Sequence, residues 1–307
     1  VEKNELGGSQ IHAHGSGAVD NEVDTEPDAF ETIKQFLSYL PQNVWQVPPR
    51  IDPEDPADRR EESLLSVIPR DRRQMYEVRE VIEAVVDRLS FFEINPGYGE
   101  ALVVGLARLD GYSVGIMAND TCHHGGAVNA TASEKMMRFV DLCDTFHMPV
   151  VNLVDNPGFL IGIQAEEEGT VRLGSRALMA VYQSTIPWIS VIIRRCYGVA
   201  GAGHGKTDGL NLRYAWPSAD WGSLPIEGGV QAAYRRDIEA ADDPDARRRE
   251  LEDMLEQYRS PLKTAEAFGV EEVIDPRDTR PLLCDWVRLA YEIIPTQLGP
   301  KARTPRP

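Results

Sequence analysis

The chain has 307 residues, of which 42% are hydrophobic, and its formal net charge is −17. This length suits one large domain or two small ones, and the composition is that of an ordinary globular protein. Such a negative charge argues against nucleic acid or an anionic membrane surface as the partner. The longest apolar runs have the length of strands and fall well short of the roughly 20 residues that a membrane-spanning helix needs.

The four cysteines are scattered and form no CxxC pair, which favours free thiols in a reducing compartment and a cytoplasmic location. They are Cys122, Cys143, Cys196 and Cys284. Cys143 and His147 have the i, i+4 spacing of helical metal ligands, but no further ligands complete a set, so we expect no metal site. No signal peptide or initiator Met opens the sequence, which suggests a cleaved or truncated N-terminus.

The first 63 residues are polar and contain one amphipathic helix candidate, Ala29–Leu40. Pro27 and Asp28 introduce it and Pro41 ends it, as expected for helix boundaries. Prolines and charges then dominate residues 43–63, a composition typical of a linker. We therefore expect the main folded unit to begin at about residue 64.

Residues 64–235 alternate between apolar runs of strand length and segments with helical periodicity. The expected strands are Ala101–Ala107, Ser113–Ala118, Val150–Val154 and Trp188–Ile193, and the expected helices are Met75–Asp87, Ala132–Thr145 and Arg172–Ser184. This alternation predicts an α/β domain with buried strands. Residues 236–307 are predicted to be mainly helical, with a charged, solvated face over Asp245–Tyr258.

The segment Ala200–Thr207 matches a loose form of the phosphate-binding loop of nucleoside triphosphatases, with Ala in place of the first Gly. Such a loop needs a helix directly after Lys-Thr, because the first amides of that helix hold the phosphate. Residues 208–217 have no helical periodicity, and the strand that ends in Asp155 precedes the loop instead of following it. A nucleoside triphosphatase is therefore the disfavoured alternative.

From Leu64 onward, a series of motifs resembles the C-terminal domain of the carboxyltransferase β subunit of biotin-dependent acyl-CoA carboxylases, of the propionyl-CoA carboxylase type. The motifs are Arg88–Glu93, Val104–Gly111, Lys135-x-x-Arg138-Phe139, Cys143-Asp144, Asp155–Phe159, Tyr214–Pro217, Val273–Pro276 and Thr279-Arg280. Each motif is weak alone, whereas their order and spacing together are specific. Residues 1–42 resemble the last segment of the family's N-terminal domain.

The resemblance implies a crotonase-like α/β fold, a spiral of ββα units. It divides the chain into residues 1–42, the tail of an N-terminal carboxyltransferase domain, the linker 43–63, and a C-terminal carboxyltransferase domain over residues 64–307. In the family the N-terminal domain holds the CoA, and most of that domain is absent here. Either the chain is a fragment, or a separate polypeptide supplies the other half.

The implied reaction moves a carboxyl group from carboxybiotin to the α-carbon of an acyl-CoA. Two oxyanions develop, on the thioester and on the biotin ureido oxygen, and backbone amides can stabilise each. By resemblance, the amides of Val199 and Ala200, after Gly198, face the biotin oxygen. Val199 stands where the family has Gly, and a β-branched residue tolerates fewer backbone conformations, which puts the aim of its amide in question.

The resemblance also places residues around the substrates. Ala202 aligns with the family position that reads acyl length, an Asp in propionyl-CoA enzymes. A second glycine turn, Gly125-Gly126-Ala127, is a candidate oxyanion loop, although an ordinary strand-to-helix connection is the favoured interpretation. Asp155, Asn156, Pro157, Gly158 and Phe159 form a predicted turn that would shape the biotin pocket without doing chemistry.

The implied partners are an acyl-CoA, a biotin carboxylase and a biotin carboxyl carrier, which bears the biotin cofactor. Apolar positions in Ala29–Leu40 and in Arg280–Ile294 would need a covering surface. We therefore expect a homo-oligomer or a complex with a CoA-binding chain. The transferase subunit of a biotin-dependent acyl-CoA decarboxylase and a non-catalytic scaffold remain as alternatives.

Overall fold

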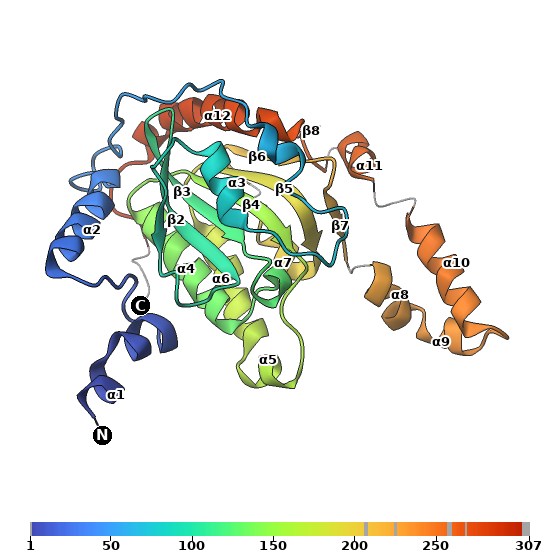
Figure 1. Ribbon diagram of the computed structural model, residues 1–307. Helices are drawn as coiled ribbons and strands as arrows, with labels where there is room; N and C mark the ends of the chain where they lie inside the picture. Colours follow the sequence, from blue (N-terminus) through green and yellow to red (C-terminus); the bar gives the residue numbers. More distant parts are fainter. Residues whose placement is uncertain (1, 206–207, 224–225, 257–259, 268, 303–307) are drawn as a thin grey trace.

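A computed structural model describes residues 2–205, 208–223, 226–256, 260–267 and 269–302. In these residues eight strands form one mixed sheet, in the order β1-β2-β3-β4-β5-β6-β8 with β7 beside β5 (Figure 1). The strands are β1 Phe92–Ile94, β2 Leu102–Leu109, β3 Tyr112–Asn119, β4 Val150–Asn156, β5 Trp188–Tyr197, β6 Asn211–Ala215, β7 Asp220–Gly222 and β8 Glu272–Val273. The α/β class predicted from the sequence is confirmed.

The sheet changes character at β3. Strands β1, β2 and β3 pair antiparallel, and every pair from β3 to β8 is parallel. Asp110 and Gly111 connect β2 to β3 with φ of 50° and 78°, the left-handed pair that a two-residue hairpin of matching twist requires. A side chain at Gly111 would collide with the carbonyl oxygen of Ile51. The backbone amide of Ile51 donates to the Gly111 carbonyl at 3.1 Å.

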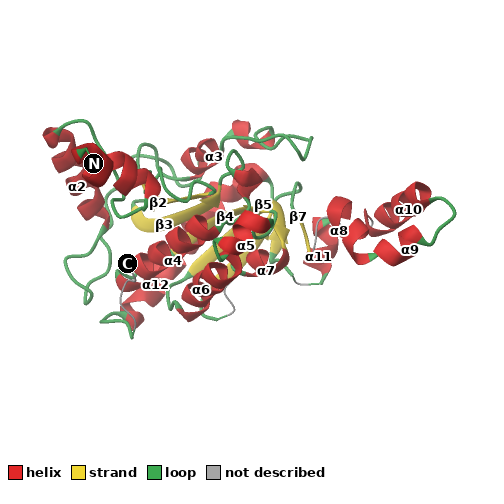
Figure 2. Ribbon diagram, turned by 90° about the horizontal axis from the view of Figure 1, so that it is seen from below, coloured by secondary structure: helices red, strands yellow, loops and turns green. Residues whose placement is uncertain are grey.

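Helices cover both faces of the sheet. The helices of the described residues are α1 Lys3–Gly7, α2 Glu26–Tyr39, α3 Val78–Val85, α4 Ala130–Thr145, α5 Ile163–Glu167, α6 Thr170–Gln183, α7 Gly198–Ala202, α8 Ile226–Ala233, α9 Arg235–Glu239, α10 Pro244–Glu256, α11 Pro261–Glu266 and α12 Thr279–Ile293. The apolar sides of α3 and α12 share one core with the sheet, and those of α4 and α6 share the other. Seen from below, α4 and α6 lie side by side across the strands (Figure 2).

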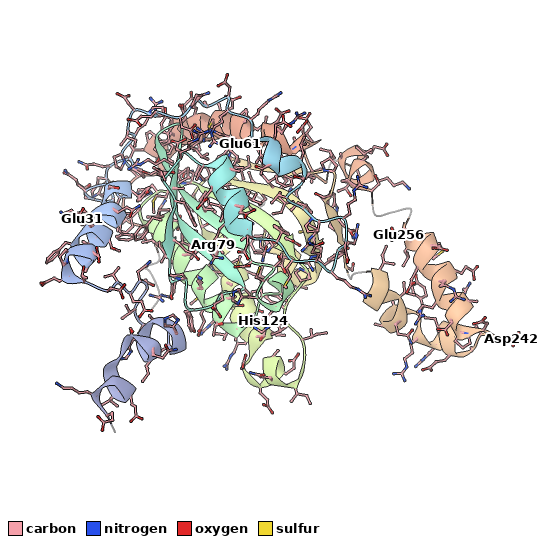
Figure 3. The ribbon with its side chains drawn as sticks, viewed as in Figure 1. Glu31, Glu61, Arg79, His124, Asp242 and Glu256 are labelled. Atoms are coloured by element: carbon pink, nitrogen blue, oxygen red, sulfur yellow. The ribbon has the colours of Figure 1, made fainter. Side chains whose placement is uncertain are left out.

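Helices α8, α9 and α10 form an arm that projects from the sheet (Figure 1). The arm has a small core of its own around Val230, Ile238 and Leu251. Polar side chains surround it, and Asp242 and Glu256 mark its outer and inner ends in Figure 3. No helix among the described residues is both long and apolar enough to cross a membrane.

The four expected strands are all present, and each ends one to four residues beyond the predicted range, while β2 begins one residue later than predicted, at Leu102. The helix expected over Met75–Asp87 is shorter, because α3 begins at Val78, and Met75 lies outside it with 56% of its surface exposed. The predicted start of this helix at Met75 was therefore wrong. The helix expected at Ala29–Leu40 begins earlier, at Glu26, since the Thr25 hydroxyl caps it by accepting the Asp28 amide.

The two helices expected to need a partner surface differ from each other. On α12 the apolar side chains of Leu283, Trp286 and Val287 are buried against this chain's own sheet, so that expectation was wrong for Arg280–Ile294. On α2, Phe30, Ile33 and Leu37 are 55%, 53% and 57% exposed. Of these two helices, only α2 has a stripe of apolar side chains exposed to solvent.

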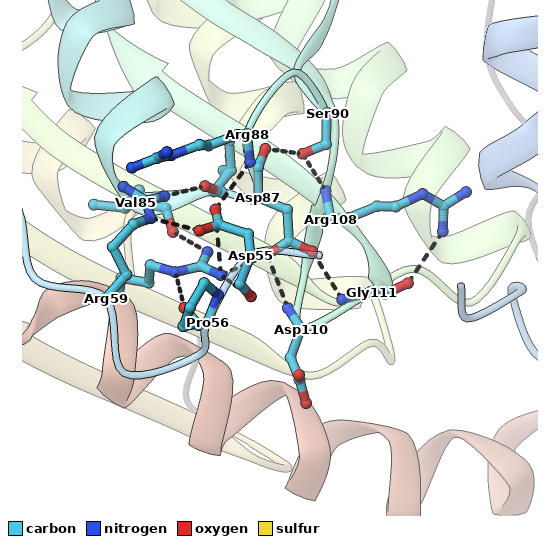
Figure 4. A network of polar contacts seen from close by, with 12 residues as sticks. Asp55, Pro56, Arg59, Val85, Asp87, Arg88, Ser90, Arg108, Asp110 and Gly111 are labelled. Carbon is cyan, nitrogen blue, oxygen red and sulfur yellow. Dashed lines mark hydrogen bonds and ion pairs between the residues drawn. The ribbon is translucent and has the colours of Figure 1, made fainter. Parts of the chain in front are cut away.

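A buried network of charges fastens residues 55–59 to the sheet (Figure 4). Arg280, 1% exposed, donates to the Asp87 carboxylate at 2.8 Å and to the carbonyls of Pro56 and Val85. The same Asp87 carboxylate accepts the amides of the Asp110-Gly111 turn at 3.1 and 2.8 Å. The Arg280–Asp87 pair thus joins α12, residues 55–56 and the β2–β3 hairpin.

Replacing Arg280 should test this network. Arg280→Ala leaves the Asp87 carboxylate buried without its cation, and loss of one partner of a buried pair costs about 3–5 kcal/mol of unfolding free energy. Urea unfolding would measure the loss. Arg235→Ala, which removes an exposed pair with Glu239 on the arm, is the control and should change little. Equal stability of the two variants would contradict the role given to Arg280.

Candidate active site

The predicted site residues meet at the carboxyl end of the parallel strands. Asp155 and Asn156 are the last two residues of β4, so the strand runs two residues further than expected and the turn begins at Pro157. The neighbouring strand β5 continues to Tyr197 and leads directly into α7, which starts at Gly198. In open α/β sheets this edge is where ligands bind.

The Asp155 carboxylate is the hub of this edge. It is fully buried and accepts from Arg194 Nε at 2.7 Å, from Arg195 Nε at 2.6 Å and from the Tyr76 hydroxyl at 2.9 Å. Burial, and then the nearby Asp155 carboxylate, raises the pKa of Tyr76 well above its usual value, so the phenol stays protonated and donates. The two cations at the end of β5 are held by one anion at the end of β4.

The glycine turn after β3 is clamped onto Asp155. His124, Gly125 and Gly126 have φ of 50°, 63° and 85°, a left-handed run that favours glycine. A Cβ at Gly126 would lie 2.6 Å from the Asp155 carbonyl oxygen, which leaves room only for glycine. Arg195 Nη2 donates to the Gly125 carbonyl at 2.6 Å, so one guanidinium binds both Asp155 and this turn.

The segments that follow these two turns also join. Val128 pairs with Phe159 in a parallel bridge, with the Val128 amide 3.0 Å from the Gly158 carbonyl. The Phe159 ring packs on Gly174 of α6, where a side chain would collide with it. Ala127 is 8% exposed. The structure therefore brings Gly125–Ala127 and Asp155–Phe159 together, but as packed, mutually bonded segments.

The turn after β5 is the short helix α7. Gly198 has φ of 64°, while Val199 has negative φ and extends its side chain into solvent, with 66% exposed. The left-handed residue is thus Gly198, and Val199 occupies a helical position that any residue can adopt. The amides of the first helical turn have no acceptor within the helix, and the side chain of the preceding Tyr197 does not cap them.

A pocket of about 470 Å³ opens beside α7. Ala202, Gly198 and Gly201 form one side of it, and Trp221 and Ile192 contribute apolar surface. The Tyr182 hydroxyl, also in the lining, donates to the Ala202 carbonyl at 2.8 Å and ties α6 to α7. This pocket adjoins the turn that the sequence singled out.

His204 links the end of α7 to β4. Asn156 Oδ1 accepts the Gly158 amide at 2.8 Å, so its Nδ2 faces His204 Nε2 at 2.7 Å. Nε2 is therefore the acceptor and the ring proton sits on Nδ1, 2.8 Å from the Asn152 side-chain amide, which can present its oxygen by a flip. Burial lowers the pKa of His204 to about 4, so the ring is neutral.

Sequence reasoning missed the residues that position this edge: Tyr76, Asn119, Asn152, Arg194, Arg195 and His204. A charged pair directly after the apolar run Trp188–Ile193 could have signalled Arg194 and Arg195, because buried charges at strand ends need a counter-charge. Tyr76 and Asn152 carry no such local signal, since their partners lie far away in the sequence.

The phosphate-loop alternative finds no support. Lys206 and Thr207 lie outside the described residues, but the segment that follows forms strand β6, not the required helix. The first residues of the matching string belong to α7. Among the described residues there is also no group of three or more His, Cys, Asp or Glu side chains that could hold a metal ion.

Comparison with known proteins decides the family, since the carboxyl transferase domain matches residues 1–297. The chain belongs to this carboxyl transferase family. It is 41% identical to the propionyl-CoA carboxylase carboxyltransferase subunit of Haloferax mediterranei and 39% identical to the methylmalonyl-CoA carboxyltransferase 12S subunit of Propionibacterium freudenreichii subsp. shermanii. It is also 35% identical to the methylmalonyl-CoA decarboxylase subunit alpha of Veillonella parvula.

The three matches cover 90%, 91% and 92% of this chain but only 54% of each relative, so the chain spans about half the length of these carboxyl transferases. Among solved structures, transcarboxylase 12S with methylmalonyl-coenzyme A bound matches all of this chain and 58% of its own, with 34% identity and a TM-score of 0.89. The crotonase-like fold expected from the sequence is confirmed.

The neutral His204 should make stability depend on pH. Its folded pKa of about 4 lies below the ordinary 6.5, so the unfolded chain binds the proton more readily, and stability is lost as pH falls below 6.5. Between pH 7 and pH 5 the wild type should lose about 2 kcal/mol more unfolding free energy than His204→Gln. Urea unfolding at both pH values measures the difference, and parallel losses would contradict a neutral, buried His204.

Proposed function

We propose that this chain is the carboxybiotin-handling half of a carboxyltransferase, which moves a carboxyl group from carboxybiotin to the α-carbon of an acyl-CoA. Family membership supports the class of reaction. The single structural observation that carries the proposal is the turn at Gly198–Ala200, whose amides begin α7 at the carboxyl edge of the sheet.

Backbone amides are the groups that this transfer needs. The ureido oxygen of biotin gains negative charge as its nitrogen leaves the carboxyl group, and a pair of fixed N–H donors stabilises such an oxyanion. We assign the donors to Val199 and Ala200. Val199 has a helical backbone and points its side chain into solvent, which supports our proposal that its amide serves as a donor although the family has a glycine here.

The small residues around the turn leave room for biotin. Biotin supplies the nitrogen that carries the carboxyl group. Gly198 and Gly201 have no side chain, so a ring system can approach the backbone closely at these two positions. We propose that Gly125–Ala127 and Asp155–Phe159 act by fixing the edge on which this turn stands. Asp155 is fully buried and its carboxylate is occupied by two arginines, which suits a positioning role.

The remaining half of the reaction requires other polypeptide. We propose that residues 1–42 are the tail of an N-terminal domain, that 43–63 link it to the domain 64–307, and that a CoA-binding half completes the site. A biotin carboxylase and a biotin carrier would be further partners. The free thiols of the described chain suit a reducing compartment, so we propose a cytoplasmic location.

The direction of transfer is part of the proposal. The names of the relatives include a carboxylase, a carboxyltransferase and a decarboxylase, so a decarboxylase subunit is a second candidate. A scaffold without activity is the alternative from another class. Transfer of a carboxyl group from malonyl- or methylmalonyl-CoA to free biotin, in an assembly with a CoA-binding half, separates an enzyme from a scaffold.

Ala200→Pro should remove one donor from the turn without removing a functional side chain. Ala200 is the third residue of α7, within the first turn where proline is tolerated. Loss of an oxyanion donor costs on the order of a hundredfold in turnover, so we expect at least that loss in carboxyl transfer to biotin, with acyl-CoA binding nearly unchanged.

Val199→Gly is the companion variant, because it restores the family residue and keeps both amides. It should retain or increase turnover. A folded Ala200→Pro protein that transfers the carboxyl group at the wild-type rate would remove this turn from the mechanism. Circular dichroism and urea unfolding establish that both variants are folded.

The exposed stripe on α2 should mediate assembly. Phe30, Ile33 and Leu37 lie along one side of the helix, and contiguous exposed apolar side chains mark interaction surfaces. We expect light scattering of the native protein to give a multimer or a complex, and Ile33→Glu with Leu37→Glu to reduce it. Gln35→Glu places a charge on another side of α2 as a control, and a monomeric wild type would contradict this expectation.

A further inference from the structure

Arg213 is a cation for which the described part of the chain provides no counter-ion. It lies in the middle of β6 and contributes to the lining of the pocket of about 470 Å³ beside α7. Its guanidinium forms no ion pair or hydrogen bond with a described residue. The nearby Glu271 carboxylate binds the backbone amide of Arg213 instead. A half-buried guanidinium without an anion is uncommon, since charges removed from water are normally paired.

Two polar atoms of β6 are buried without a hydrogen-bond partner. Arg213 Nε has no exposed surface and no hydrogen-bond partner, and Asn211 Oδ1 is in the same state. The residues are two apart on β6, so their side chains leave the same face of the strand. Most buried polar atoms in native proteins are satisfied, so this face of β6 is unusual in its polar groups, and Arg213 is the one of the two residues that also lines the pocket.

The position of the guanidinium connects it to the proposed reaction. A Cβ at Gly205, three residues after Ala202, would lie 3.8 Å from Arg213 Nη1. The same pocket is lined by Gly198, Ala202 and Cys196. Burial raises the pKa of the Cys196 thiol to about 12, so this cysteine stays neutral and offers Arg213 no anion.

The shape of the pocket suits a small organic acid. Its volume falls within the roughly 300–1,000 Å³ of small-molecule sites, and such sites combine apolar walls with a few polar groups. Trp221, Ile192 and Tyr182 supply the walls. A planar guanidinium matches a carboxylate with two parallel hydrogen bonds, which a spherical ion cannot form.

Together these observations point to a carboxylate-binding residue: we propose that Arg213 binds a carboxylate of the reactants in the pocket beside α7. This inference rests on the proposed function and names a recognition group within it. The carboxylate has two sources, a carboxylate at the far end of the acyl chain of the acyl-CoA, or the carboxyl group that is being transferred.

Direct binding tests the residue without catalysis. The native protein, labelled with ¹⁵N, is titrated with malonate, and the Arg213 Nε–H signal is identified by its loss in Arg213→Lys. We expect malonate to shift this signal and chloride at equal ionic strength to leave it in place. The same response to both anions would overturn the inference.

Kinetics of the complete assembly identify the source. Arg213→Met removes the guanidinium, and kcat/KM is compared for an acyl-CoA with a terminal carboxylate and for a neutral acyl-CoA of equal length. If kcat/KM falls about tenfold or more only for the acyl-CoA with the terminal carboxylate, Arg213 binds that carboxylate. A loss of this size corresponds to one lost charge-assisted hydrogen bond. An equal loss for both, together with slower carboxylation of free biotin, assigns the transferred carboxyl group.

Arg235→Met, on the exposed arm, controls for a general loss of positive charge. If Arg213→Met has wild-type kcat/KM for both acyl-CoA substrates while Ala200→Pro still blocks carboxyl transfer, the inference is overturned. The proposed function then stands. A wild-type assembly without any carboxyl transfer would contradict the proposed function instead. In that case the malonate titration still decides the role of Arg213.

Discussion

The arrangement of the candidate site depends on the buried carboxylate of Asp155. Without it, Arg194 and Arg195 would bring two positive charges to the end of β5 with nothing to neutralise them, at a cost of several kcal/mol per ion. With it, the end of β5 is anchored to the end of β4, and Arg195 carries the connection to Gly125. The position of α7 follows, because its first residue comes directly after β5.

Fixed backbone donors are useful only when they do not reorganise during the reaction. The turn at Gly198 has one anchor on each side: the bonds of Asp155 precede it, and those of His204 with Asn152 and Asn156 follow it. Both anchors lead back to β4. A single strand, itself between β3 and β5 in the centre of the sheet, therefore sets both ends of the segment that we assign to carboxyl transfer.

The local sequence predicted the strands whose residues are buried along their whole length. It did not predict the site residues whose roles depend on partners far away in the sequence. Val150–Val154 and Trp188–Ile193 were predicted as strands because an all-apolar run suits a strand covered on both faces. The strand β5 was cut short at Ile193, since Arg194 and Arg195 read as its polar end. Strand β6 was missed because the polar residues Asn211 and Arg213 interrupt its apolar residues. Strands β7 and β8, of three and two residues, are too short for any pattern. The turn at Gly198 came from family resemblance, whereas the roles of Tyr76, Asn152 and Arg213 arise only in three dimensions.

The order of strands across the sheet follows their order along the chain from β1 to β6, with β8 after β6. Each strand on this path pairs with a strand that precedes it in the sequence. No strand has to insert between two strands that are already paired. The β2–β3 hairpin, closed by two residues, brings the most local contacts, and each parallel strand afterwards requires a longer excursion of the chain. The sheet can therefore grow from one edge in the direction of synthesis, with the unpaired backbone of the newest strand as the template for the next.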